Sequence, residues 1–216
     1  MINFKVYPDV EGAKALDIAR MCASVSASSG VTVAVCPPVT ELGYVSRNVN
    51  IPVLSQNADP RSPGASTGWI TPSMIKASGA TGTLINHAEH KQTMKDIEAT
   101  LRLCKECDLL TVVCADSVEA AAEIARYHPD MIAVEPPELI GGDISVTDAD
   151  PGIVERTVKA VKDVDNGISV LCGAGVRSGK DVKRALELGA DGVLLASGIV
   201  KSKDPKASLL DLIGQL

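Results

Sequence analysis

Glu135 and His87 stand at positions suited to acid–base chemistry. Glu135 follows four apolar residues, and Pro136-Pro137 directly after it rules out a helix-capping role. A carboxylate at the end of a buried strand is a poor structural choice but a good general base. His87 also follows a strand-like run, where a nearby helix N-terminus would keep an imidazole neutral. The pair could therefore move a proton and polarise a neighbouring bond.

Asn3 and Lys5 lie two residues apart in the first apolar run, 2–6, so both side chains should face the same way in a strand. A lysine on an inward face is costly unless it meets an anion, which makes Lys5 a candidate for a substrate phosphate or a developing oxyanion. The alternative is a lysine fraying at an exposed terminus. The two residues alone do not decide between these interpretations.

Two other patterns could indicate a metal or redox site. His87 and His90 form a His-x-x-His, but no carboxylate-rich segment follows. Cys104 and Cys107 form a Cys-x-x-Cys inside a helical pattern, without a second pair to complete a zinc site. We therefore expect no metal, and reduced, mostly buried cysteines.

Glycines cluster after the later strand-like runs. The segments 172–176 and 195–198 contain small residues that let the backbone approach a ligand, and a following helix N-terminus would offer N–H donors. The segment after Glu135 starts with two prolines and ends in Gly141-Gly142, which is typical of a loop that closes over a ligand.

Short, β-branched runs alternate with helical patterns along the whole chain. We expect strands at 2–6, 31–36, 52–56, 83–86, 110–115, 131–135, 169–172 and 192–196. Helical patterns include 12–28, 94–107, 117–127, 152–164 and 179–188. Eight strands, each followed by a helix, predict an α/β fold, a single (β/α)8 barrel over residues 1–216. The loops after the strands of such a barrel form its site, which is where the residues above lie.

Composition narrows the function classes. Aromatic residues make up only 2% of the chain, so the core must consist of Val, Ile, Leu and Ala. The formal charge of -6 argues against a nucleic-acid surface. No apolar run resembles a signal peptide or a membrane span, so we expect a cytoplasmic protein that does not bind membranes.

From Asn3 to about Lys201, the chain resembles the triosephosphate isomerase family, and its shorter archaeal-type branch in particular. The similar segments are Asn3-Phe4-Lys5, Asn86-His87-Ala88-Glu89, Glu135 to Gly141, Gly173-Ala174-Gly175 and Ala196-Ser197-Gly198. The resemblance implies a TIM barrel that interconverts dihydroxyacetone phosphate and glyceraldehyde 3-phosphate without a cofactor.

The same resemblance implies roles for single residues. Glu135 would be the base and His87 the neutral electrophile, an arrangement of which triosephosphate isomerase is itself the standard example. Lys5 would stabilise the enediolate and Asn3 would help to position the substrate. The residues whose backbone would hold the phosphate are Ile140, Gly175, Ala196 and Ser197, and those with supporting roles are Glu89, Thr67, Gly141 and Gly173.

Thr67-Gly68, in the long segment 60–71, resembles the family's loop that reaches into a neighbouring subunit, which implies a homo-oligomer, either a dimer or a tetramer. Two positions depart from the family pattern. Ala88 stands where serine is usual, which leaves the resting position of the Glu135 carboxylate in doubt. Gly141-Gly142-Asp143 stands where Gly-Thr-Gly is common, so the closure of the loop could differ in rate.

Two other functions are compatible with parts of the pattern. Another phosphate-binding barrel, such as a phosphosugar isomerase of amino-acid biosynthesis, would suit the segment 173–191. It would leave Lys5, His87 and Glu135 without a purpose. A non-catalytic phosphate-binding protein that kept the fold is the other alternative, and a direct assay of isomerisation separates all three.

Overall fold

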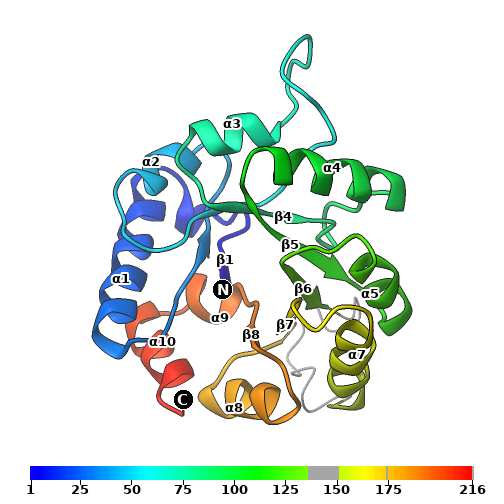
Figure 1. Ribbon diagram of the computed structural model, residues 1–216. Coiled ribbons are helices and arrows are strands. Elements are labelled where there is room, and N and C mark those ends of the chain that lie inside the picture. The colour runs from blue at the N-terminus through cyan, green and yellow to red at the C-terminus, as the bar shows by residue number, and fades with distance from the viewer. Residues whose placement is uncertain (136–150, 174, 216) are drawn as a thin grey trace.

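Eight parallel strands alternate with helices in a computed structural model that describes residues 1–135, 151–173 and 175–215 (Figure 1). The strands are short, and each stands inside or beside a run predicted from sequence. They are β1 (Ile2–Asn3), β2 (Val35–Cys36), β3 (Leu54–Ser55), β4 (Gly82–Ile85), β5 (Leu110–Ala115), β6 (Met131–Val134), β7 (Ser169–Cys172) and β8 (Gly192–Val193).

The strands close into a barrel. Strands β3 to β8 pair in chain order as one parallel sheet, and β1 pairs with β2 as a second. Single bridges join the two sheets at both seams, Ile2 to Leu195 and Val35 to Val53. The Asn3 N–H strengthens the first seam by donating to the Leu195 carbonyl at 2.8 Å. The predicted closed (β/α)8 barrel is therefore confirmed.

Helices surround the strands as an outer ring (Figure 1). They are α1 (Ala13–Ser29), α2 (Leu42–Ser46), α3 (Pro72–Ala77), α4 (Met94–Glu106), α5 (Val118–Ala125), α7 (Pro151–Val164), α8 (Gly179–Glu187), α9 (Ser197–Val200) and α10 (Pro205–Ile213), with a 3-10 turn η1 at Pro8–Val10. Local signals explain several starts: the side chains of Thr93, Ser117 and Ser178 each accept an N–H of the first turn that follows. Among the described residues, no helix is long and apolar enough to cross a membrane.

Alternate strand residues form two apolar layers. One cluster lies inside the barrel and consists of Ala34, Cys36, Leu54, Leu84, Val112, Cys114, Ala133, Leu171 and Leu194. The intervening residues, such as Val35, Val113 and Val170, pack outward with apolar residues of the helices. Glu135 lies two residues beyond Ala133, so the alternation directs its side chain toward the barrel's interior.

The first strand is shorter than the sequence predicts. We expected a strand over 2–6 with Asn3 and Lys5 on one face, but β1 ends at Asn3. Lys5 has a left-handed backbone with φ 52°, and its N–H donates to the Asn3 side-chain oxygen at 2.9 Å. This local hydrogen bond replaces the strand pairing that Lys5 would need, because a short polar side chain can compete for backbone groups.

The segment between β3 and α3 extends beyond the ring of helices (Figure 1). Two hydrogen bonds between Asp59 and Ile70 join the two ends of this segment, which we call its foot. The Asp59 N–H donates to the Ile70 carbonyl at 2.8 Å, and the Ile70 N–H donates to the Asp59 carboxylate at 2.6 Å. At its outer part, the Arg61 guanidinium lies 4.5 Å from the centre of the Trp69 ring. The loop is thus shaped by its own contacts, while Thr67 is exposed.

Candidate active site

Glu135 lies at the carboxyl end of β6 and is 6% exposed. Its N–H donates to the Ala115 carbonyl at 2.8 Å, which continues the pairing of β6 with β5 by one residue. Among the described residues, no group forms a hydrogen bond with its buried Oε2 atom. A buried carboxylate oxygen without a partner is costly in a folded protein, so this atom is available to a ligand.

Gly173 makes room for that carboxylate. A methyl group built on Gly173 would lie 3.0 Å from the Glu135 Cγ atom and 3.2 Å from its Oε1 atom. It would also lie 3.0 Å from the Leu194 carbonyl oxygen, which belongs to the backbone and cannot move away cheaply. A larger residue at 173 would therefore displace the Glu135 side chain.

A left-handed turn at Asn86, with φ 60°, presents His87 to the same space. The Asn86 side chain holds this turn from both sides, by donating to the Cys114 carbonyl at 2.9 Å and accepting the Gln92 N–H at 2.9 Å. His87 itself is 6% exposed. Its orientation therefore depends on the strand end and on the residues that follow it.

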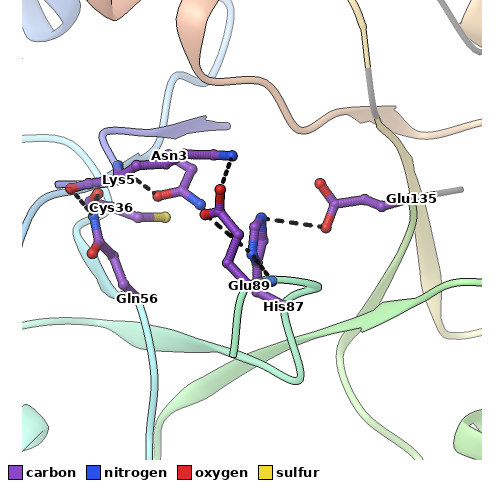
Figure 2. Close-up of polar contacts among 7 residues, drawn as sticks. All are labelled: Asn3, Lys5, Cys36, Gln56, His87, Glu89 and Glu135. Atoms are coloured by element: carbon purple, nitrogen blue, oxygen red, sulfur yellow. Dashed lines mark hydrogen bonds and ion pairs between the residues drawn. The ribbon is translucent and has the colours of Figure 1, made fainter. Parts of the chain in front are cut away.

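The histidine ring has a defined tautomer. Its Nδ1 atom accepts the Glu89 N–H at 3.1 Å, so in the neutral ring the proton resides on Nε2. That Nε2 atom points at Glu135 and lies 3.8 Å from its Oε2 atom (Figure 2). The arrangement places an N–H donor and a carboxylate side by side, as carbonyl polarisation and proton transfer require.

Lys5 approaches from the opposite side of the barrel mouth. Its ammonium forms an ion pair with Glu89 at 2.8 Å, and its side chain is 12% exposed (Figure 2). Its backbone carbonyl accepts the Gln56 amide at 2.7 Å, and the same amide group donates to the Cys36 carbonyl at 3.0 Å. Lys5 is therefore half-buried and held at both its ammonium and its carbonyl, which a fraying terminal lysine would not be.

One pocket brings most of the predicted site residues together. Those that line it are Asn3, Lys5, His87, Glu135, Gly175, Ala196 and Ser197. Glu89 supports it through Lys5 and His87, whereas Thr67 lies away from it on the exposed loop. Ile140 and Gly141 lie outside the described residues. Gly175 has φ 76°, a left-handed conformation that explains the glycine there.

The cysteines are reduced, and five of them, Cys22, Cys36, Cys104, Cys114 and Cys172, are buried. Burial raises the pKa of Cys104 to about 12, which makes a reactive Cys104–Cys107 pair a poor interpretation. Burial, followed by the charge and hydrogen bonding of Glu135, raises the pKa of Cys114 well above its ordinary value. Over the described parts of the chain, no three His, Cys, Asp or Glu side chains gather in a way that could hold a metal ion.

Sequence reasoning missed several residues that shape the site. The side chains of Gln56 and Gln92 act through hydrogen bonds to segments far away in sequence, so no local signal marks them. Asn86 could have been found, because asparagine before a histidine at a strand end favours a left-handed turn. Tyr7 and Arg177 also line the pocket. Tyr7 belongs to no segment that we singled out for chemistry, whereas Arg177 lies in the segment 173–191 that suits the rival phosphate-binding barrel.

Fold and site together define a (β/α)8-barrel enzyme with an acid–base site at the carboxyl ends of its strands. A family model described as triosephosphate isomerase matches residues 1–215. The triosephosphate isomerase of Methanocaldococcus jannaschii is 47% identical over 99% of this chain and 97% of its own length. That of Methanopyrus kandleri is 48% identical over 100% of this chain and 96% of its own. The chain belongs to the triosephosphate isomerase family, whose members interconvert dihydroxyacetone phosphate and glyceraldehyde 3-phosphate.

Proposed function

We propose that Glu135 and His87 run this isomerisation as base and electrophile. The Glu135 carboxylate takes a proton from C1 of dihydroxyacetone phosphate while the His87 Nε2–H donates to the C2 carbonyl oxygen. The His87 imidazole then carries a proton from the C1 oxygen to the C2 oxygen of the enediolate. C2 regains a proton from the Glu135 carboxyl group, which yields glyceraldehyde 3-phosphate. The observation that supports this proposal best is the 3.8 Å approach of His87 Nε2 to Glu135 Oε2 in a buried pocket.

Lys5 and Asn3 complete the proposed chemistry. The Lys5 ammonium lies at the mouth of the barrel and would stabilise negative charge as it develops on the substrate oxygens. Glu89 holds that ammonium at 2.8 Å, and its own N–H sets the histidine tautomer. Asn3 fixes the turn at Lys5 through its side-chain oxygen, so we assign it a positioning role beside the substrate.

The phosphate would lie over β7 and β8. Gly175, Ala196 and Ser197 line the pocket there, and their backbone N–H groups suit an anion. We extend this assignment to the backbone of Ile140, with Gly141 as part of the closing loop. A structure with phosphoglycolate tests it: the phosphate should contact Gly175 and Ser197, and a position elsewhere would contradict the assignment.

A coupled assay with glyceraldehyde 3-phosphate tests the activity. We expect turnover that survives exhaustive chelation, because Glu135, His87 and Lys5 suffice for a proton transfer beside a carbonyl. Loss of turnover with EDTA and its return with zinc would instead make His87 and His90 metal ligands. Activity on a phosphosugar of amino-acid biosynthesis, or none at all, would favour one of the two rival functions.

We also propose a homo-oligomer whose contacts involve the loop of residues 60–71. The loop projects from the barrel, and Trp69, the chain's single tryptophan, is 43% exposed on it. At the foot of the loop, the Gln92 side chain donates to Asn57 at 3.0 Å and to the Ala58 carbonyl at 2.8 Å, which links the loop to the Asn86 turn.

Sedimentation and tryptophan fluorescence together test the assembly. We expect a dimer or tetramer at micromolar concentration, and a red shift of Trp69 emission when dilution dissociates it. A fully active monomer with unchanged emission would contradict the proposal. Thr67→Arg should weaken assembly if the loop is buried in the contact, since a charge would have to lose its hydration there.

Two broader proposals concern the whole chain. We propose one domain over residues 1–216, supported by the contacts between β1 and the Leu195 segment that join the two ends of the chain. Calorimetry should then show one unfolding transition.

We also propose a cytoplasmic location, supported by six free cysteines, which cell fractionation would check.

A further inference from the structure

The loop of residues 86–92 contains His87 and is attached to the barrel at its first residue. There, the Asn86 side chain donates to the Cys114 carbonyl of β5 at 2.9 Å. At the other end, the Gln92 backbone N–H donates to the Asn86 side chain at 2.9 Å, which closes the loop on itself. Neither contact involves the Gln92 side chain. An attachment at Asn86 alone would leave the loop able to pivot about that residue.

The Gln92 side chain provides a second attachment. Its amide nitrogen donates to the Asn57 side-chain oxygen at 3.0 Å and to the Ala58 carbonyl at 2.8 Å, which uses both of its N–H groups. Asn57 is 7% exposed and Ala58 is fully buried, so both acceptors belong to buried residues. Loss of the Gln92 amide would leave these two acceptors without their donor, which is more costly than the loss of an exposed hydrogen bond.

The segment that receives this amide is itself firmly held. The Asn57 carbonyl accepts the Ser55 hydroxyl at 2.7 Å, and the Asn57 side chain donates to the Asp59 carboxylate at 3.0 Å. The other oxygen of that carboxylate accepts the Ile70 N–H at 2.6 Å. Ser55 belongs to β3, which pairs with β4 in the barrel sheet. The Gln92 side chain therefore joins its loop to the end of the neighbouring strand.

We propose that Gln92 is a positioning residue for His87. Its side-chain amide ties the loop of residues 86–92 to the end of β3, and this keeps the imidazole 3.8 Å from Glu135. The Glu89 N–H, which sets the histidine tautomer, belongs to the same loop and would move with it. The inference rests on the proposed role of His87 as the electrophile. A misplacement of about 1 Å can cost about 10²-fold in rate, so a looser loop should slow turnover.

Gln92→Met tests the proposal, because methionine keeps the length of the side chain but has no N–H to donate. We expect kcat to fall about five- to thirtyfold and KM to stay within about twofold, since the phosphate contacts lie on other loops. Ser117→Ala is the control for lost stability. It removes the hydroxyl that caps α5 and does not line the pocket, so its thermal midpoint should fall while kcat stays within about twofold.

Nitrogen NMR provides a measurement that a purely structural role would not change. His87 should show a single tautomer in the parent enzyme, and mixed or broadened ring signals in Gln92→Met. The ring signals of Ser117→Ala should match those of the parent. Asn57→Leu removes an acceptor of the Gln92 amide, so the double variant should lose much less kcat than the product of the two single losses.

The outcomes separate this inference from the proposed function. If His87→Gln slows turnover but Gln92→Met keeps the parent's kcat, Gln92 has no positioning role while the mechanism stands. A fall in kcat without any change in the His87 ring signals would also overturn the role of Gln92. If His87→Gln itself leaves kcat unchanged, the proposed electrophile is wrong, and the inference about Gln92 fails with it.

Discussion

The Nε2 atom of His87 lies 3.8 Å from the Oε2 atom of Glu135, and each side chain is 7% exposed. Among the described residues, that carboxylate oxygen has no hydrogen-bond partner, while the histidine ring is held by the Glu89 N–H on its other side. The His87 ring is fixed, and the Glu135 Oε2 atom has an unused lone pair. This asymmetry is what a proton-transfer site needs, since the base must move its proton and the electrophile must not turn.

Replacing Glu135 by glutamine should cost at least about 3 kcal/mol of barrier lowering, because a general base contributes about 10²–10⁴ in rate. The loss should fall on kcat and leave KM nearly unchanged, since the phosphate contacts lie on other loops. Glu123→Gln, on the exposed surface of α5, is the matched control. A folded Glu135→Gln enzyme that keeps more than about a tenth of its kcat would overturn the assignment.

The tautomer of His87 can be observed directly. Because Nδ1 accepts a backbone N–H, nitrogen NMR should show the proton of the neutral ring on Nε2. The chain has only two other histidines, His90 and His128, and substituting each one assigns the spectrum. A proton on Nδ1 would contradict the orientation described above. His87→Gln should also slow turnover, through lost polarisation of the carbonyl.

Ala88→Ser tests the departure from the family pattern beside His87. Turnover should stay within roughly tenfold, about 1.4 kcal/mol, because the change affects a resting contact of Glu135 rather than a transition-state contact. Steady-state kinetics of the variant beside the parent enzyme provide the measurement. A hundredfold change in either direction would mean that the resting position of the carboxylate controls the rate.

Lys91 and Asp116 should contribute to stability in a pH-dependent way. The Lys91 hydrogen bond at 2.7 Å lowers the pKa of Asp116, so the contribution is present above the unfolded pKa of about 3.9 and is lost as pH falls through the lower, folded pKa. Both side chains are about two-fifths exposed, so the effect should be at most about 1 kcal/mol. Lys91→Met should lower the thermal midpoint at pH 6 but not at about pH 2, with Lys95→Met as control. An equal drop in the thermal midpoint at both pH values would exclude the Lys91–Asp116 ion pair as the cause of that drop.

Native enzyme should expose one thiol to a chromogenic disulfide reagent. Five of the six cysteines are buried, and only Cys107 is partly exposed. We therefore expect one thiol, that of Cys107, to react quickly in the native enzyme. After denaturation, all six thiols should react. Cys107→Ser should remove the fast phase. Rapid reaction of two or more thiols in the folded protein would show that the barrel opens more readily than its packing implies.

The sequence predicted the barrel because its strands are short, β-branched and separated by helical patterns. It drew attention to Glu135 and His87, since a polar residue directly after a buried strand has few structural purposes. The structure places both residues in one pocket, and their catalytic roles stay a prediction. It did not predict the turn at Lys5, where the Asn3 side chain accepts the Lys5 N–H, because the pattern of residues 2–6 reads equally well as a strand. The Gln56 amide that donates to the Lys5 carbonyl is 51 residues away and leaves no local signal. Likewise, nothing local to His87 reveals that the Gln92 side chain donates to Asn57 and to the Ala58 carbonyl, 35 and 34 residues away. Contacts between distant segments set the final orientation of the site.

Cys114 interacts with Glu135, which we propose as the base in a reaction whose product is an aldehyde. Thiolates add to aldehydes, and glyceraldehyde 3-phosphate would be trapped as a thiohemiacetal if one formed next to Glu135. Only the deprotonated sulfur is a strong nucleophile, and the raised pKa keeps Cys114 protonated at neutral pH. Burial first, and the neighbouring Glu135 carboxylate second, thus make this thiol unreactive, so the product can leave without forming an adduct.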